Sequence, residues 1–459
     1  MATSHFDVLV IGGGQAGPPL AHALASAGKQ VALAERRHLG GSCVNFGCTP
    51  TKAVIASARI AHLARRGAEF GLGIAAVDVD FPAVLARARK IVADQRGGLE
   101  KWLAGTEKLE LLRGHARIEG RDGAAFRVRV GDRKVTADQV VLDTGTRSLM
   151  PPIEGVDGID FLDAGNWLDR SQLPGRLAIV GGGYIGLEMA QLYRRLGSEV
   201  VVIEGGDQVA GQEDPEVASA LQRVLEGEGV EVRLKTRVAR VAGKAGRVEV
   251  TLEGDSGSSP IEATHLFLAT GRKPNTDDLG LETIGVKTSK KGFVEADGRL
   301  ATSVRGVWAA GDIRGGPMFT HTAWDDYRVL ESQLLGDGSR TTERVVPYAV
   351  FTDPQLGRVG MTEGEARKSG RPVKVARFDM KRNGKAVESG AAGGFIKVVL
   401  DGETDRVLGA AVLANEGAEL VHIYIGLMNA DAPVQVLRDA VHIHPTLAEA
   451  VQSAVAAPG

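Results

Sequence analysis

The stretch FDVLVIGGGQAGPPLAHALASAGKQVALAERR, residues 6–37, holds the pattern that decides the fold. An apolar, β-rich run leads into Gly12-x-Gly14-x-x-Gly17, then a helical segment rich in Ala and Leu, then a second apolar run that ends at Glu35. Such glycines allow a tight turn and bring backbone N–H groups close to a pyrophosphate at the positive end of the helix. The acid accepts hydrogen bonds from a ribose hydroxyl. Alone, the pattern also fits an ordinary turn between a strand and a helix.

The same arrangement returns in GRLAIVGGGYIGLEMAQLYRRLGSEVVVIEGG, residues 175–206. Gly181-x-Gly183-x-x-Gly186 precedes a helical segment and a strand that ends at Glu204, at the same spacing from the first glycine as in the first copy. The repeated order of strand, loop, helix, strand and acid predicts two dinucleotide-binding folds. One of them suits a tightly held flavin, FAD, and the other a diffusible nicotinamide.

The chain of 459 residues contains only two cysteines, Cys43 and Cys48, just after the first loop. A structural disulfide is typical of small secreted domains that cannot build a core, whereas 43% of this chain is apolar. A zinc site needs about four Cys or His ligands at paired spacing, and the nearest histidines, His38 and His62, are scattered. In a reducing compartment the pair is therefore predicted to be catalytic, with no metal site. Two unrelated buried thiols are the plainer alternative.

Composition narrows the class of partner. Lys and Arg number 55 against 57 Asp and Glu, so the net charge of -2 favours neither nucleic acid nor an anionic membrane. The N-terminus lacks a basic region, and no segment reaches the roughly 18 apolar residues that a membrane span requires. We expect a cytoplasmic protein that acts on small molecules.

The stretch GGSCVNFGCTPTK, residues 40–52, resembles the redox motif of the class I pyridine nucleotide-disulfide oxidoreductases. This family includes dihydrolipoamide dehydrogenase, glutathione reductase and mercuric reductase. The residues around the two cysteines look most like those of the mercuric-reductase-like branch. Further segments that resemble the family follow in order: LDTGTR (142–147), LATGRKPN (268–275), TSVRGVWAAGD (302–312), FTDPQLGRVGMTEGEA (351–366) and HIHPTLAEA (442–450).

The resemblance implies an α/β fold with two Rossmann-like domains and a C-terminal α+β dimerisation domain. Residues 1–150 and 271–338 would form a split FAD-binding domain, residues 151–270 the NAD(P)-binding domain, and residues 339–459 the dimerisation domain. The implied activity is an FAD-dependent NAD(P)H:disulfide oxidoreductase, which passes electrons through FAD to a Cys43–Cys48 disulfide and on to a small or carrier-bound disulfide.

The resemblance also assigns roles to residues of the redox centre. Cys48 would lie against the flavin as a thiolate, stabilised by the N-terminus of the helix that follows it. Cys43 would be the outward thiol that exchanges with substrate. His444 would be its base, oriented by Glu449. In the family this last pair comes from the second subunit, which implies a homodimer with shared active sites.

Three more residues carry implied roles. Lys52 and Glu188 would form an ion pair beside the reactive edge of the flavin; a plain surface salt bridge is the alternative. Tyr184 would cover the flavin until nicotinamide displaces it, or would merely pack. The implied cofactor-binding residues are Gly12, Gly14, Gly17, Glu35, Lys52, Gly145, Asp312, Thr320 and His321 for FAD, and Gly181, Gly183, Tyr184, Gly186, Glu204 and Gly271 for NAD(P).

Two positions bear on the cofactors directly. Glu204 favours NADH over NADPH, because a carboxylate binds a free 2′-hydroxyl and repels a 2′-phosphate. Arg194, Arg195 and Arg237 keep NADPH open as the alternative. Asp143 departs from the family pattern, since it stands where that segment usually has a small residue.

Two other functions stay open. A mercuric or other metal-ion reductase would fit the branch resemblance, although the chain ends VQSAVAAPG without the C-terminal cysteine pair that such enzymes usually carry. A flavin-bound redox sensor without turnover is the alternative from a different class. The presence of His444 and Glu449 counts against it, because a sensor needs no substrate base.

Overall fold

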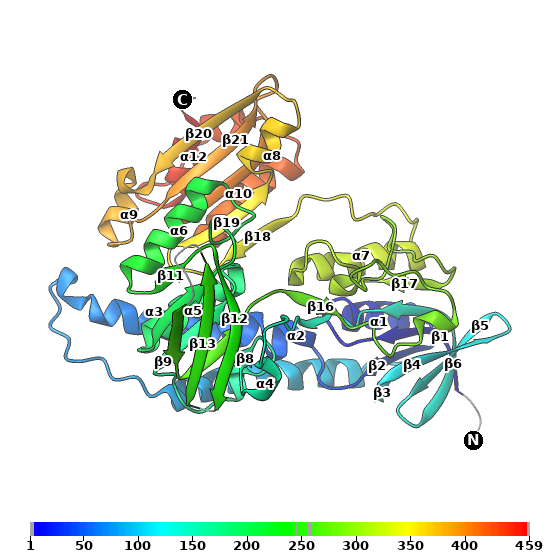
Figure 1. Ribbon diagram of the computed structural model, residues 1–459. Helices are drawn as coiled ribbons and strands as arrows, with labels where there is room; N and C mark the ends of the chain where they lie inside the picture. Colours follow the sequence, from blue (N-terminus) through cyan, green and yellow to red (C-terminus); the bar gives the residue numbers. More distant parts are fainter. Residues whose placement is uncertain (1–3, 245, 255–258, 457–459) are drawn as a thin grey trace.

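The computed structural model describes residues 4–244, 246–254 and 259–456. Figure 1 shows three groups of strands: the first lies around β1 and β6 at the right, the second around β9 and β13 at the lower left, and the third around β20 and β21 at the upper left. The chain leaves the first group for the second and then returns to the first before it builds the third.

The first group is a seven-stranded sheet in the order β3-β2-β1-β6-β5-β4, with β17 against β6. The strand pairs around β1 are parallel, and β5 and β4 extend the sheet in antiparallel fashion. Its strands are β1 (Ser4–Ile11), β2 (Val31–Glu35), β3 (Leu109–Arg113), β4 (Ala116–Asp122), β5 (Ala125–Val130), β6 (Arg133–Leu142) and β17 (Val307–Ala309). The helices along this part are α1 (Gly17–Ser26), α2 (Gly41–Asn45), α3 (Cys48–Arg65), η1 (Gly67–Phe70), α4 (Phe81–Ala104), η4 (Leu281–Thr283), η5 (Gly311–Arg314) and α7 (Thr320–Leu335).

The second group repeats the parallel unit of strand, helix and strand. Its five-stranded parallel sheet has the order β11-β10-β9-β15-β8, and a three-stranded antiparallel sheet, β12-β13-β14, lies beside it. Its elements are η2 (Val156–Gly158), β8 (Leu162–Asp163), η3 (Trp167–Asp169), β9 (Arg176–Val180), α5 (Tyr184–Leu196), β10 (Glu199–Ile203), α6 (Pro215–Gly227), β11 (Glu231–Arg233), β12 (Thr236–Lys244), β13 (Arg247–Gly254), β14 (Ser259–Ala263) and β15 (His265–Leu268). The short strands β7 (Thr146–Ser148) and β16 (Arg272–Pro274) pair where the chain enters and leaves this group.

The third group is a five-stranded antiparallel sheet in the order β18-β19-β22-β21-β20. Helix α10 packs on β19 and β22, and α12 packs on β20 and β21. Its elements are β18 (Pro347–Val350), β19 (Gln355–Gly360), α8 (Glu363–Lys368), β20 (Val373–Asp379), η6 (Met380–Arg382), α9 (Gly384–Glu388), β21 (Phe395–Asp401), β22 (Val407–Ala414), α10 (Gly417–Asn429), α11 (Gln435–Asp439) and α12 (Ala448–Ala456).

One hydrophobic cluster joins the three groups. It contains Phe81 of α4, Trp167 and Tyr193 of the second group, and Phe395 of the third, all of them buried. Because these side chains are excluded from water together, they fix the groups relative to one another.

The expectation of a mixed α/β fold with a separate C-terminal domain is confirmed. The exact domain boundaries at residues 150, 270 and 338 stay a prediction. No helix within the three described ranges combines the length and the hydropathy that a membrane crossing requires.

Candidate active site

The two glycine loops have the same geometry. Gly12 and Gly181 have φ of 111° and 108°, and an added Cβ would lie 2.2 Å from Asp143 O and 2.5 Å from Ala269 O, respectively. A Cβ on Gly17 would lie 2.3 Å from Gly12 O, and one on Gly186 would lie 2.0 Å from Gly181 O. Only glycine fits such positions, because a side chain would collide with backbone. Each loop therefore makes its tight turn for a steric reason.

The two acids also close their loops in the same way. Glu35 accepts hydrogen bonds from Gly13 N at 2.8 Å and Arg37 N at 2.6 Å. Glu204 accepts the equivalent pair from Gly182 N at 2.6 Å and Gly206 N at 2.7 Å. Since a carboxylate has about four acceptor positions, each acid keeps capacity for a ribose hydroxyl.

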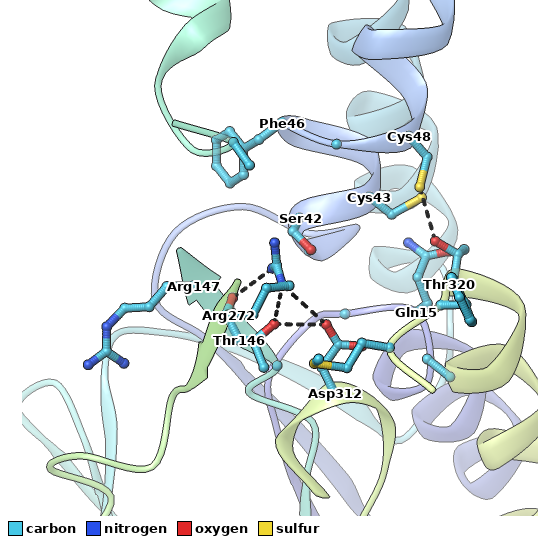
Figure 2. Close-up of a pocket in the computed structure, with 18 of the residues that line it drawn as sticks. Gln15, Ser42, Cys43, Phe46, Cys48, Thr146, Arg147, Arg272, Asp312 and Thr320 are labelled. Atoms are coloured by element: carbon cyan, nitrogen blue, oxygen red, sulfur yellow. Dashed lines mark hydrogen bonds and ion pairs between the residues drawn. The ribbon is translucent and has the colours of Figure 1, made fainter. Parts of the chain in front are cut away.

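Two cavities open from these loops. The first has a volume of about 1560 Å³ and runs from the first glycine loop to both cysteines (Figure 2). The second, of about 710 Å³, lies along the second loop and is lined by Gly183, Glu204 and Glu213, among others. Tyr184 and Gln212 line both cavities, so they stand between them.

The cavities separate the predicted site residues into three sets. The first cavity is lined by Gly12, Gly14, Glu35, Cys43, Cys48, Lys52, Gly145, Tyr184, Glu188, Asp312, Thr320 and His321. The second is lined by Gly183, Tyr184 and Glu204. Gly17, Gly181, Gly186, Gly271, His444 and Glu449 are not among the described residues that line either one. Gly17, Gly181 and Gly186 serve the turns described above, as expected for the glycines of such loops, and Gly271 has φ of 114°, which also favours glycine. Their predicted part in cofactor binding stays a prediction.

Both cysteines are free thiols in this structure. A hydrogen bond from the Cys43 thiol lowers the pKa of Cys48 to about 6, which burial opposes and which Thr320 and Lys52 assist. The same hydrogen bond, with burial, raises the pKa of Cys43. Cys48 is therefore the thiolate of the pair at neutral pH.

The two thiols lie together at the wall of the first cavity. Cys48 faces this cavity, next to Thr320 at the start of α7 (Figure 2). The expected roles, with Cys48 against the flavin and Cys43 as the thiol that exchanges with substrate, stay predictions. The distance from Cys48 Sγ to Thr320 Oγ1 is 3.3 Å.

The backbone between the cysteines is held from outside the motif. Asn45 donates to Leu39 O at 2.9 Å and accepts from Arg96 of α4 at 2.6 Å. Trp167 of the second group donates to Phe46 O at 2.8 Å. These bonds fix the turn that brings the two sulfurs together. Arg96 and Trp167 carry no motif signal, so the sequence analysis missed them.

Lys52 and Glu188 form the expected ion pair, with Nζ and Oε2 2.7 Å apart. The side chain of Glu188 is only 9% exposed, which excludes a plain surface salt bridge. Its other oxygen accepts from Phe351 N at 2.9 Å, and Lys52 Nζ lies 4.5 Å from the centre of the Phe351 ring. The pair thus joins α3 of the first group to α5 of the second, beside Phe351, which follows β18 of the third group, and it faces the first cavity.

Asp312 is already engaged at the floor of the first cavity (Figure 2). Thr146 Oγ1 donates to Asp312 Oδ2 at 2.8 Å and accepts from Arg272 Nε at 2.6 Å. Both partners come from the short strands β7 and β16. Asp312 therefore keeps a second oxygen for a ligand hydroxyl.

Asp143 lies beneath the first glycine loop. It is 5% exposed and accepts from Gly17 N at 2.8 Å. A Cβ on Gly14 would lie 2.7 Å from Asp143 Oδ2, so the glycine makes room for this carboxyl group. Burial raises the pKa of Asp143 well above its ordinary value, and the charges of Asp312, Asp326 and Glu35 raise it further.

Two of the three arginines that could favour NADPH form contacts with other groups. Arg195 is 5% exposed and pairs with Glu228 at 2.7 Å and Asp353 at 2.8 Å. Arg194 donates to Glu228 O at 2.7 Å. Arg237 lies near Gly205, where an added Cβ would be 3.7 Å from its Cγ. Only Arg237 adjoins the stretch after Glu204.

His444 and Glu449 are paired, with Nδ1 and Oε1 3.0 Å apart, and Glu449 also accepts from Thr446 N at 2.8 Å. The Thr446 amide and then His444 lower the pKa of Glu449. The His444 side chain is 78% exposed. One chain forms the pair but does not bring it to its own cavity.

The His321 imidazole contacts a backbone carbonyl group in this structure. Its Nε2 lies 2.6 Å from Pro347 O, and burial lowers the pKa of the imidazole. It still lines the first cavity beside Thr320.

The first cavity fits FAD by its shape and donor set. It combines a glycine cradle that side chains would fill, a carboxylate at each of two expected sugar positions, and a volume above the roughly 300–1,000 Å³ of pockets for smaller ligands. No group of three or more His, Cys, Asp or Glu within the described ranges is arranged to hold a metal ion.

Comparison with known families identifies two segments. The sequence pattern described as pyridine nucleotide-disulphide oxidoreductase matches residues 6–326, and the pattern of its dimerisation domain matches residues 346–455.

Individual relatives align over nearly the whole chain. A probable pyridine nucleotide-disulfide oxidoreductase of Escherichia coli, RclA, is 32% identical over 97% of this chain and 98% of its own. A dihydrolipoyl dehydrogenase of Thermus scotoductus is 36% identical over 98% of this chain and 97% of its own. Neither carries the name of a mercuric reductase, so the expected branch stays a prediction.

Solved structures of similar proteins have the same fold. The Cu(II) complex of RclA from Escherichia coli, described as an HOCl-induced flavoprotein disulfide reductase, is 32% identical to this chain. It superposes with a TM-score of 0.87 over 97% of this chain and 98% of its own. LpdA of Mycobacterium tuberculosis, 25% identical, superposes with a TM-score of 0.89 over 98% and 99%.

Proposed function

The chain belongs to the pyridine nucleotide-disulphide oxidoreductase family and is an NAD(P)H-dependent flavoprotein disulfide reductase; from this premise we propose that it uses NADH to reduce a small or carrier-bound disulfide through Cys43 and Cys48. The observation that carries the proposal is the lowered pKa of Cys48 in a cavity that runs unbroken from the first glycine loop to both sulfurs. FAD bound there would accept electrons from the nicotinamide and deliver them to the cysteine disulfide.

The residues of the chain then divide the exchange reaction. Two electrons and one proton convert the Cys43–Cys48 disulfide into the thiol of Cys43 and the thiolate of Cys48. Cys43 gives its proton to His444 of a second subunit and attacks one sulfur of the substrate disulfide, which releases the other as a thiol that takes the proton back. Cys48 then attacks Cys43, which restores the disulfide and releases the second half of the substrate as a thiolate, and this thiolate takes a proton from solvent.

A second subunit is part of the proposal. The matched dimerisation domain supports a homodimer. Val441 and Ile443, which flank His442 beside the proposed base, are 100% and 80% exposed. Apolar side chains so fully exposed are suited to a partner surface.

NADH as the donor rests on Glu204. Its carboxylate faces the second cavity, and Arg194 and Arg195 are held by other groups. A 2′-phosphate would therefore meet negative charge at Glu204, and of the three arginines considered only Arg237 lies beside the stretch that follows it.

The test is an anaerobic NADH titration followed by visible absorbance. The first two electrons should produce a broad long-wavelength band in the wild type and no such band in Cys48→Ser. Cys43→Ser has no disulfide to reduce, so it should show the band before NADH is added and lose it as its flavin is reduced. Direct bleaching of the wild-type flavin without that band would show that the cysteines are outside the electron path. Turnover with disulfide acceptors, compared between NADH and NADPH, then separates an enzyme from a flavin-bound sensor.

A metal-ion reductase is the second candidate, and the Cu(II) complex of RclA favours it. In that reaction NADH would reduce two Cu(II) ions to Cu(I) and release one proton, with both cysteines returning to the disulfide. Cu(II)-dependent NADH oxidation that is lost in Cys43→Ser, with Hg(II) measured in parallel, would support it. Oxidation that persists in Cys43→Ser would contradict it.

A further inference from the structure

Tyr184 separates the two cavities, and its hydroxyl group is tied to a single carboxylate. It begins helix α5 directly after Gly183 and lines both cavities. The hydroxyl donates to Glu213 Oε1 at 3.3 Å. Glu213 itself lines the second cavity, on the stretch that leads from Glu204 to helix α6.

Glu213 is also bound from the third group. Its Oε1 accepts a hydrogen bond from the hydroxyl of Tyr348 in β18. Its Oε2 lies 3.7 Å from Nε of Arg358 in β19, and both side chains are almost completely buried, at 0% and 1% exposed. The neighbouring Asp214 pairs with the buried Lys397 of β21 at 3.1 Å. The carboxylate that holds Tyr184 is therefore fixed to the C-terminal sheet.

The Arg358 guanidinium has the features of a group retained for its charge. Neither Nη1 nor Nη2 has a hydrogen-bond partner in the described part of the chain, and Oε2 of Glu213 has none either. Burying a charge without full hydrogen bonding is costly. The ion pair is therefore expected to contribute little to stability, and its main effect is to hold the Glu213 carboxylate in position.

Stacked rings continue the connection to the first cavity. Tyr184 stacks on Tyr348 at 5.2 Å between ring centres, and Tyr348 stacks on Phe319 at 5.4 Å. Phe319 directly precedes Thr320, which contacts Cys48. The ring of Tyr184 is therefore packed as well as hydrogen-bonded in its position between the cavities.

We propose that Glu213, anchored by Tyr348 and Arg358, is the latch that holds Tyr184 closed between the two cavities and thereby sets the apparent affinity for the reduced nicotinamide. The inference rests on the proposed function, in which electrons must pass from a nicotinamide in the second cavity to a flavin in the first. Glu213 is a positioning residue in this scheme, because it acts through Tyr184.

The latch has a quantitative consequence. If the nicotinamide reaches the flavin only when Tyr184 is displaced, the apparent Kd equals the intrinsic Kd divided by the fraction of open molecules. A hydrogen bond to a charged acceptor that holds the closed state shifts this fraction by about tenfold or more. Removal of the bond should therefore tighten the apparent Kd for NADH about tenfold.

The experiment is anaerobic stopped-flow reduction of the FAD-loaded protein over a range of NADH concentrations. Tyr184→Phe removes the hydrogen bond and should lower the apparent Kd about tenfold. Glu213→Gln keeps an amide oxygen as acceptor but removes its charge, so it should lower the apparent Kd by less. Because both changes act on the same hydrogen bond, the double variant should show no more than the effect of Tyr184→Phe alone. Reduction by dithionite, which needs no binding groove, should proceed at the wild-type rate in all three.

The controls keep the outcomes separate. Tyr184→Phe leaves the Glu213–Arg358 ion pair intact, so it tests the latch even where Glu213→Gln fails to fold. Tyr327→Phe should behave like the wild type, because this tyrosine of α7 packs against a hydrophobic cluster of the first group and lines neither cavity. An unchanged Kd in Tyr184→Phe, or additive effects in the double variant, would overturn the latch. A wild-type flavin that neither NADH nor NADPH reduces would instead refute the proposed function.

Discussion

At the scale of single residues, Cys48 shows how its neighbours divide the control of one sulfur atom. The Cys43 thiol donates to it, Thr320 lies 3.3 Å away, and Lys52 adds positive charge. Burial works in the opposite direction, but the favourable contacts prevail and the pKa falls to about 6.

Thr320→Val should therefore raise the pKa of Cys48, because it removes a donor to the thiolate at nearly constant volume. Thr320→Ser should restore the wild-type value. The measurement is the rate of Cys48 alkylation in the reduced protein against pH, which should be half-maximal near pH 6 in the wild type. Identical profiles in all three proteins would remove Thr320 from the account.

Asp143 gives a second prediction at this scale. Its pKa is raised by burial, so it is neutral where an ordinary aspartate is ionised. Its contribution to stability is complete below the ordinary pKa and is lost as pH rises through the raised one. Ionisation would place a negative charge beneath the loop, next to Glu35, Asp312 and Asp326. FAD affinity should accordingly fall as pH rises through this range.

Asp143→Asn tests this directly. The amide keeps an acceptor for Gly17 N and stays neutral, so FAD affinity should lose that part of its pH dependence and remain high in alkaline buffer. Fluorescence titration of the apoprotein with FAD across a pH series measures both quantities. The same fall of affinity in wild type and variant would assign the pH dependence to another group.

At the scale of elements, Lys397 of β21 docks the third group onto helix α6. Its buried Nζ lies 2.7 Å from Glu216 and Glu363 and 3.1 Å from Asp214, the residue that precedes α6. Asp214 in turn accepts from Glu363 N and Gly364 N at the start of α8. One ammonium group thus holds two helix starts together.

Lys397→Met should lower the free energy of unfolding by about 3 kcal/mol, because it leaves the buried carboxylate of Asp214 without its cation. Urea denaturation measures the loss. Lys374→Met is the matched control on the neighbouring strand β20, since its pair with Asp405 is 48% exposed at the lysine. This exposed pair should change the value by less than about 1 kcal/mol. Equal losses in both variants would contradict the clamp.

The elements also show which parts of the structure could be predicted from the sequence. Gly12 to Glu35 and Gly181 to Glu204 were predictable, because their contacts are local and their residue types are dictated by the turn. Asp143 was visible only as a departure from pattern, since its partner Gly17 lies 126 residues away. Glu213, Tyr348, Arg358 and Arg96 gave no local signal at all: each depends on a contact between distant segments that only the folded chain creates.

At the scale of the whole molecule, one chain leaves its proposed base outside its own cavity. If the second subunit supplies His444, mixed dimers of Cys43→Ser and His444→Ala chains contain one intact site, built from the unaltered cysteines of one chain and the unaltered histidine of the other.

Co-expression of the two inactive chains should therefore restore disulfide reductase activity to about a quarter of the wild-type value, when half of the dimers are mixed and each has one working site. Each variant alone should remain inactive. Activity measured on the purified mixed dimer decides the matter. If the mixture stays as inactive as its components, the base belongs to the same chain as the cysteines.

Glu204 accepts two hydrogen bonds, from Gly182 N and Gly206 N, and these bear on any attempt to change the coenzyme preference of this protein. The carboxylate that we propose to discriminate against the 2′-phosphate also holds the loop in shape, so coenzyme recognition and loop conformation depend on the same side chain. Replacing Glu204 with a small neutral residue would remove the negative charge and both hydrogen bonds to the loop at once. A redesign for NADPH would have to rebuild the turn first, and only then add positive charge around Arg237.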